Sequence, residues 1–197
     1  MVKRFVGKIS LALALCLSSV PGFAQEFYLD WAGDSAKVNY SPSNTYDASL
    51  PWGTDVYWNR DADLLAGLYI ATPLEGSGFT EWLFSVKLSL FYLSLDTYNA
   101  STVGVSVGFN AGYKFLTTMP TSIILSATLS PDVFNTRNEI DSVSQFSARL
   151  QADLSPYLRG YLGYRVYTAK LNKGHFPNRD DKVNFEDSLF LGFGLLF

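Results

Sequence analysis

A short polar segment near the C-terminus carries residue types that could bind a metal or act as a general base. His175 is the only histidine in the chain, and Asp180 and Asp181 follow it. A hydrolase would also need a nucleophile held within reach of such a base, and the strands predicted below place no serine at a suitable height. The sequence has no HExxH, CxxC or phosphate-loop motif. We therefore expect a plain surface loop without metal or cofactor, and a membrane-embedded lipid hydrolase or acyltransferase is the weaker alternative.

A second group of residues has the charges needed to line a pore or hold a polar ligand. They lie in segments where polar and apolar residues alternate, and each falls on the polar phase: Asp55, Lys87, Lys114, Arg149, Asp153, Arg159, Arg165 and Glu186. Buried charges are tolerated when they are paired or hydrogen-bonded. We expect a packed network of mutually satisfied ions, and a narrow pore or polar pocket is the alternative.

The alternation itself predicts the elements that position these charges. In the segment 158–171, apolar residues occupy most even positions, whereas Arg159 and Arg165 occupy odd ones. Successive side chains of a strand point to opposite faces, and in a transmembrane barrel these faces meet lipid and lumen. An Arg or Lys on the lipid face near the midplane would cost about 2–4 kcal/mol. Lys87, Lys114, Arg149 and Arg165 all avoid that face, which favours a membrane barrel.

Segment length separates a membrane barrel from a soluble β-sandwich. The alternating segments 82–95, 102–115 and 142–154 are much longer than the common soluble strand of about 5–6 residues. A strand of about ten residues, tilted by about 40°, rises roughly 25 Å, which is the height of an outer-membrane apolar band. The class predicted is therefore all-β, a single-chain antiparallel transmembrane β-barrel.

The number of strands depends on how residues 26–40 are used. Strands are predicted near 50–59, 63–72, 81–95, 102–115, 121–130, 142–154, 158–171 and 184–197. A hairpin over 26–40, with Gly33-Asp34 as its turn, would give about ten strands and place both termini on the periplasmic side. Bacterial barrels have even strand numbers, so ten is expected. Eight strands, with 26–40 as a cap or plug, is the alternative.

The N-terminal region predicts export. Residues 1–8 are basic, residues 9–20 are apolar, and Gly22 and Ala24 are small residues at the exit. This pattern is typical of a secretory signal peptide, here residues 1–24, which leaves 25–197 as the barrel domain; a lipoprotein anchor at Cys16 is the rival.

Without the leader the chain has no cysteine, and its formal charge is −6 because three of the 15 basic and none of the 18 acidic residues are lost. An acidic chain without a basic run argues against nucleic acid as a partner.

The C-terminus reads SLFLGFGLLF and predicts a closing strand. Its odd positions form an apolar row that would face lipid, with Phe193, Leu195 and the terminal Phe197 as the mark read by the barrel-assembly machinery. Ser188, Gly192 and Gly194 fall on the other face and are small. Glu186 precedes them on this inward phase and is expected to pair with an inward arginine.

Several stretches resemble one family of small outer-membrane proteins. LSPYLRGYLGYR at 154–165, SPDV at 130–133 and the terminal SLFLGFGLLF are similar to the family usually called YfaZ. The resemblance covers nearly all of the chain after the leader and is clearest from about residue 102. It implies an exported Gram-negative barrel and carries no catalytic or binding residue over.

These observations lead to one functional expectation with an alternative. The chain is expected in the bacterial outer membrane after Sec export, as a structural or interaction barrel with a packed polar lumen. Its expected partners are outer-membrane lipid, lipopolysaccharide and, during biogenesis, the assembly machinery. A narrow channel or small-solute transporter is the alternative.

Overall fold

The structure is a computed structural model that describes residues 26–42, 52–74, 81–115, 117–136, 139–176 and 181–197. The predicted leader 1–24 with Cys16, the first residues of the strand expected from residue 50, and Asp180 lie outside these residues. Within them, no helix is long and apolar enough to cross a membrane.

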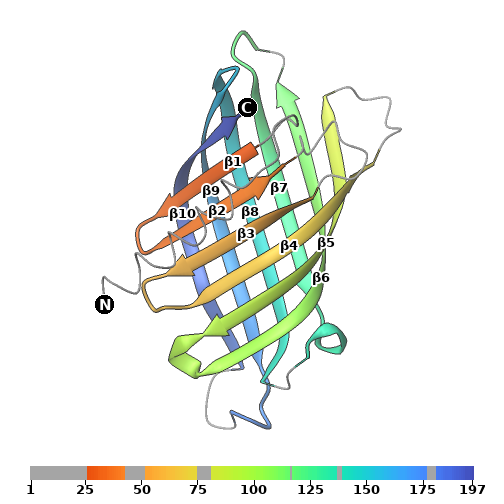
Figure 1. Ribbon diagram of the computed structural model, residues 1–197, viewed down its shortest axis with the longest axis vertical. Coiled ribbons are helices and arrows are strands. Elements are labelled where there is room, and N and C mark those ends of the chain that lie inside the picture. Colours follow the sequence, from red (N-terminus) through yellow and green to blue (C-terminus); the bar gives the residue numbers. More distant parts are fainter. Residues whose placement is uncertain (1–25, 43–51, 75–80, 116, 137–138, 177–180) are drawn as a thin grey trace.

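Ten antiparallel strands form one closed barrel in which β1 pairs with β10 (Figure 1). Their bounds are β1 Glu26–Ala32, β2 Ser35–Ser41, β3 Trp52–Asn59, β4 Leu64–Pro73, β5 Trp82–Leu95, β6 Ala100–Phe115, β7 Thr121–Ser130, β8 Ile140–Ser155, β9 Leu158–Leu171 and β10 Lys182–Leu196. Each strand pairs with its neighbours in sequence, so every connection is a hairpin. The predicted fold class and the ten-strand count are confirmed.

The segment that decided the strand count lies in the barrel wall. β1 and β2 form a hairpin with Leu29 opposite Val38, and β1 joins β10 with Leu29 opposite Phe193. The alternative of eight strands with 26–40 as a cap or plug is therefore wrong. The described bounds of the other strands agree with the predicted ranges to within two residues.

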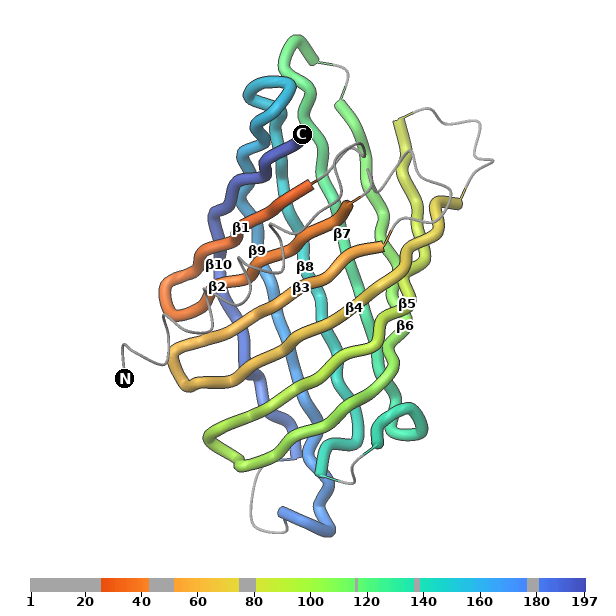
Figure 2. Tube along the Cα trace, in the orientation of Figure 1, coloured from red at the N-terminus to blue at the C-terminus, as the bar shows by residue number. Residues whose placement is uncertain are grey.

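The two ends of the barrel differ in what they carry, as the tube in Figure 2 shows. Glu26 pairs with Leu196, so β1 begins and β10 ends at one end, which we call the terminal rim. The opposite end, the loop rim, carries the turn between β1 and β2 and the 3₁₀ turns Asp96–Tyr98 and Asp132–Phe134. The segment between β9 and β10 lies at the loop rim as well.

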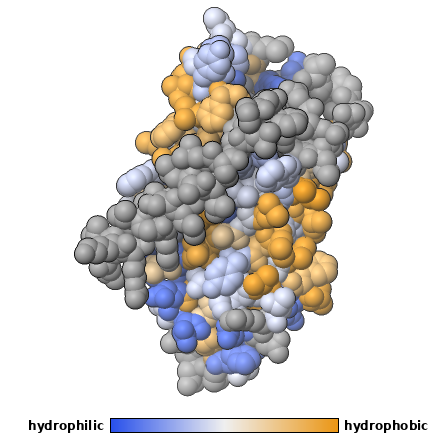
Figure 3. Space-filling model, in the orientation of Figure 1, coloured by the Kyte–Doolittle hydropathy of each residue, from blue (hydrophilic) through white to orange (hydrophobic). Residues whose placement is uncertain are grey.

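The outward phase of the strands is apolar. Large exposed side chains along β5 to β10 include Leu90 at 54%, Leu162 at 52% and Leu191 at 68% exposure. Figure 3 shows hydrophobic residues along the flank of the barrel and hydrophilic ones gathered toward the loop rim, at the lower end of the view. A solvated protein seldom exposes so much contiguous apolar surface, so this band is suited to lipid.

Inward glycines let large side chains cross the lumen. A Cβ at Gly192 would overlap the ring of Tyr161, and one at Gly194 would overlap Tyr28. The small residues of the predicted strand 184–197 therefore face tyrosines of β9 and β1. In a barrel of about this size, side chains are expected to fill much of the interior.

Candidate functional site: the charged lumen

The inward phases of β1, β2, β3, β5, β8, β9 and β10 bring charged side chains together in the lumen. The most buried cluster centres on Arg165 of β9, whose side chain is 1% exposed. Its Nε donates to Glu186 Oε1 at 2.8 Å, and its Nη1 donates to Asp30 Oδ2 at 3.2 Å. Its Nη2 donates to Ser35 Oγ at 2.9 Å. One guanidinium thus joins two carboxylates from β10 and β1.

Aromatic groups and a bulge complete this cluster. The guanidinium carbon lies 5.4 Å from the ring centre of Tyr57 and 5.1 Å from that of Phe190. The Tyr57 hydroxyl donates to Glu186 Oε2 at 2.6 Å. The register of β10 shifts between Asn184 and Glu186, so both residues after Asn184 turn inward. Glu186 therefore accepts from both an arginine and a tyrosine.

A second cluster shares one carboxylate between two lysines. Asp55 Oδ2 lies 3.2 Å from Lys37 Nζ and 3.9 Å from Lys87 Nζ. Lys37 also donates to the Tyr167 hydroxyl at 3.2 Å. The Lys87 ammonium lies 4.1 Å from the ring centre of Tyr69, a cation–π contact. The second ammonium is thus stabilised by an aromatic face as well as by the shared acid.

A third cluster lies toward the terminal rim. Arg159 Nε contacts Asp153 Oδ1 at 2.5 Å, and its Nη1 donates to the Tyr28 hydroxyl at 2.8 Å. Arg149 lies over two aromatic rings, with its guanidinium carbon 5.2 Å from the centre of Tyr28 and 5.5 Å from that of Tyr161. The tyrosines of β1 and β9 therefore bridge these arginines to the rest of the network.

The structure brings most of the predicted lumen charges into these clusters. Lys114 differs, because it shares the inward phase but is exposed near the end of β6. Three further charges that sequence reasoning missed complete the network: Glu26, Asp30 and Lys37. The sequence could have revealed these three residues, because they occupy the positions that alternate with the apolar residues of 26–40. With Glu26 at the terminal rim included, five acidic residues of the network match five basic ones: Glu26, Asp30, Asp55, Asp153 and Glu186 against Lys37, Lys87, Arg149, Arg159 and Arg165.

An apolar cluster occupies the lumen toward the loop rim, and we call it the apolar plug. It consists of buried inward side chains together with two partly buried rings that pack against them: Tyr57, Leu65, Phe91, Leu93, Leu95, Ala100, Ile140, Val143, Tyr167, Ala169, Leu171, Val183 and Phe185, with Tyr98 and Phe176. Leu93, Leu95 and Ala169 are 0% exposed. An inward residue that lined an open pore would contact water, so these side chains indicate a lumen closed near the loop rim.

A cavity of about 150 Å³ remains beside the charged clusters. Its lining includes the long basic side chains of Lys37 on β2, Arg149 on β8 and Arg165 on β9. Small polar residues of β7 and β8, such as Ser126 and Ser147, line it as well. The volume is of the order of a few water molecules, so the lumen holds a small polar chamber.

The histidine-containing loop forms no site in the described residues. His175 is exposed, and Asp181 pairs with Lys173 at 3.3 Å. The hydrogen bond and charge of Lys173 hold the pKa of Asp181 below its ordinary value. In the turn before β4, burial raises the pKa of Asp63. No group of three possible metal ligands occurs in the part of the chain that is described.

Comparison with known proteins identifies similar folds at low sequence identity. No protein-family model and no curated protein matches the chain. A bacterial polysaccharide outer membrane secretin superposes with a TM-score of 0.49 and 14% identity, covering 83% of this chain and 55% of that one. A KdgM porin gives a TM-score of 0.42 and 8% identity, covering 88% and 99%. The chain thus spans about half the length of the secretin, and neither likeness transfers a residue role.

Proposed function

We propose that the chain is a small barrel of the bacterial outer membrane whose lumen is closed, with a structural or interaction role. The observation that carries this proposal is the apolar plug, with Leu93, Leu95 and Ala169 fully buried on the inward phase. Between the plug and the terminal rim, the inward charges balance and are held by ion pairs and aromatic rings. Such a lumen stabilises the barrel and leaves no continuous aqueous path through the described residues.

The outer-membrane location is part of the proposal. A closed barrel has no unpaired strand edge and can cross a bilayer, and the exposed apolar band on β5–β10 fits lipid. The predicted leader supports Sec export, and the termini would then be periplasmic. Membership of the YfaZ family and a non-enzymatic role stay predictions; assays of phospholipase and acyltransferase activity would test the latter.

A gated channel is the second candidate. The polar chamber lined by Lys37, Arg149 and Arg165 favours it, because displacement of the plug would join this chamber to the loop rim. In this alternative, solutes would pass through the narrow chamber, and movement of the plug would open and close the path. The closed barrel needs no such movement.

Thiol accessibility tests the closed lumen. The only cysteine, Cys16, belongs to the predicted leader, so a single cysteine can be introduced without background. We expect Gly174→Cys, in the exposed loop after β9, to react quickly with a small charged methanethiosulfonate reagent. Ala169→Cys, inside the plug, should react only after denaturation. Rapid labelling of Ala169→Cys in the folded barrel would refute the closed lumen.

A further inference from the structure

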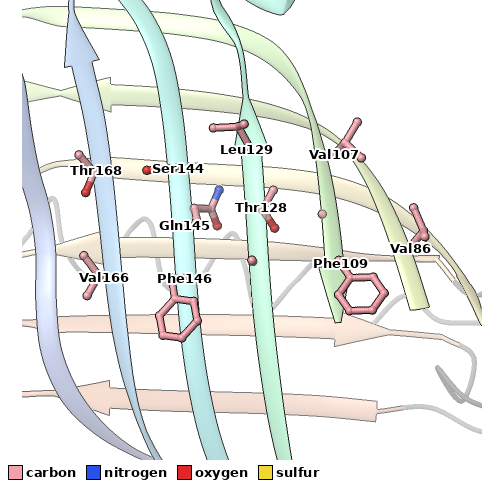
Figure 4. A pocket seen from close by; sticks show the side chains of 12 residues that line it. Val86, Val107, Phe109, Thr128, Leu129, Ser144, Gln145, Phe146, Val166 and Thr168 are labelled. Carbon is pink, nitrogen blue, oxygen red and sulfur yellow. The ribbon is translucent and has the colours of Figure 1, made fainter. Parts of the chain in front are cut away.

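The outer surface of β5–β9 contains a depression between two phenylalanines (Figure 4). Register places Phe109, Ala127 and Phe146 in one row across β6, β7 and β8. Both rings are exposed by more than 40%, and the alanine between them is small. In the next row toward the loop rim, Leu129 lies opposite Ser144. The floor of the depression is therefore formed by the small side chains of Ala127 and Ser144, and it runs diagonally across β7 and β8.

The depression leads toward a pair of like charges. Ser144 lies opposite Thr168, which lines the depression, and Ser142 lies opposite Lys170 on the same outward phase. Lys170 is two residues beyond Thr168, which is about 7 Å along the strand. It lies directly opposite Lys182 of β10. Both lysines are exposed.

The carboxylate of Asp181 compensates this lysine pair only in part, because its charge acts on Lys170 while its salt bridge is to Lys173. Like charges placed directly opposite each other on a sheet are destabilising. Neither Lys170 nor Lys182 forms a salt bridge with a described residue, and Asp181, next to Lys182 in sequence, pairs with Lys173. If the barrel is inserted as proposed above, this pair near the loop rim would lie beyond the apolar band, at the level of the lipid headgroups. An anionic group between them would relieve their repulsion.

We propose that the depression holds an acyl chain of an anionic, phosphate-bearing lipid of the outer leaflet, and that Lys170 and Lys182 bind its phosphate. The proposal rests on the membrane insertion proposed above. The depression measures about 510 Å³ and opens along the outer surface of the barrel, where one side of an acyl chain can lie. Its lining is apolar, as an acyl chain requires, and its charged end matches an anionic headgroup. The two features lie on one continuous outward surface of β8 and β9.

Lipid titration followed by native mass spectrometry tests the site. The folded barrel in mild detergent is titrated with phosphatidylglycerol and, separately, with phosphatidylcholine that has the same acyl chains. We expect one retained phosphatidylglycerol and clearly weaker retention of phosphatidylcholine. A lysine near an anionic lipid surface contributes enough for about a five-fold change in affinity, so the Lys170→Gln/Lys182→Gln variant should bind phosphatidylglycerol about thirty-fold more weakly.

Two further variants separate the parts of the site. Ser144→Phe fills the depression and should weaken the retention of both lipids. Arg60→Gln, which removes a loop-rim charge that is paired with Asp34, is the matched control and should change neither. Equal affinity of the double glutamine variant and the wild type for phosphatidylglycerol would overturn the proposal, as would unchanged retention in Ser144→Phe.

The membrane insertion is checked in the same samples. Unboiled and boiled protein are compared on denaturing gels, and vesicle insertion is measured by flotation. A barrel that floats with vesicles but shows no selective lipid would overturn this inference alone. Wild-type protein that neither floats nor shows heat-modifiable migration would overturn the proposed function, and this inference with it.

Discussion

Replacing Arg165 by methionine removes the positive charge from the most buried ion cluster. The variant retains a long apolar side chain beside Tyr57 and Phe190, so packing changes little. Glu186 and Asp30 lose the guanidinium that joins them. Glu186 retains the hydrogen bond from Tyr57, and Asp30 retains that from Tyr161. The perturbation therefore isolates the charge.

The magnitude follows from burial. Side-chain exposure is 1% for Arg165, 5% for Glu186 and 15% for Asp30. Removing one partner of a buried pair costs about 3–5 kcal/mol, because it leaves an uncompensated charge. We expect Arg165→Met to lower the free energy of unfolding by this amount. Arg165→Lys retains a charge but cannot donate in the same fork, so its loss should be smaller.

Urea unfolding in lipid vesicles, followed by tryptophan fluorescence, measures the effect. Arg60→Met is the matched control, since Arg60 and Asp34 are 3.6 Å apart on the surface with side chains 82% and 75% exposed. Exposed pairs of this kind contribute about 0–1 kcal/mol. The expected order of stability is wild type and Arg60→Met, then Arg165→Lys, then Arg165→Met.

The reasoning would be refuted by a stable Arg165→Met variant. A free energy of unfolding within about 1 kcal/mol of the wild type would mean that the two carboxylates do not depend on the guanidinium. If Arg165→Met yields no folded barrel, Arg165→Lys still tests the account. A lysine variant less stable than Arg60→Met supports it, and an equally stable one contradicts it.

Three other changes probe the wall, the lipid face and assembly. Gly192→Ala places a Cβ against a tyrosine ring and should destabilise the barrel by about 1–3 kcal/mol. Gly33→Ala is the control, because Gly33 has open space around it, and it should not change stability. The urea midpoints of the two variants and the wild type measure the difference. Leu150→Lys, on the middle of the lipid-facing side of β8, should cost about 2–4 kcal/mol, and Leu154→Lys near the strand end about 0–1 kcal/mol; equal losses would argue against a bilayer around this face. Deletion of Phe197 should reduce the fraction of protein assembled into the outer membrane, measured by heat-modifiable migration, and unchanged assembly would remove its role as a signal.

Period-two alternation was sufficient to predict the strands. In β9 the two arginines fall on one phase, and Leu158 and Leu162 fall on the other, because lipid rejects charge while the lumen accepts it in pairs. The same rule, extended to 26–40, places Lys37 and Asp30 inward. Strand number followed from parity, and the hairpin of β1 and β2 closes the barrel as predicted.

Glu186 pairs with an inward arginine as expected, but the other ion partners were beyond reach of the sequence. Arg165 and Asp30 are far apart in the chain and meet only because β1 closes against β10. The bulge near Asn184 depends on the pairing of β9 with β10, which a single strand does not reveal. The sequence of β5 contains one sign of the apolar plug. Leu93 and Leu95 lie on the same inward phase as Lys87, but they are apolar. Recognising a plug required several strands placed side by side, since each strand supplies only part of it.

Conductance of a planar bilayer tests the closed lumen most directly. Purified wild-type barrel, shown to be inserted, is expected to give no stable current steps at moderate voltage, because the plug interrupts the lumen. Stable ion-selective steps that Lys87→Ala or Arg149→Ala alters would contradict the account, since ions would then pass the charged clusters of the wild-type protein.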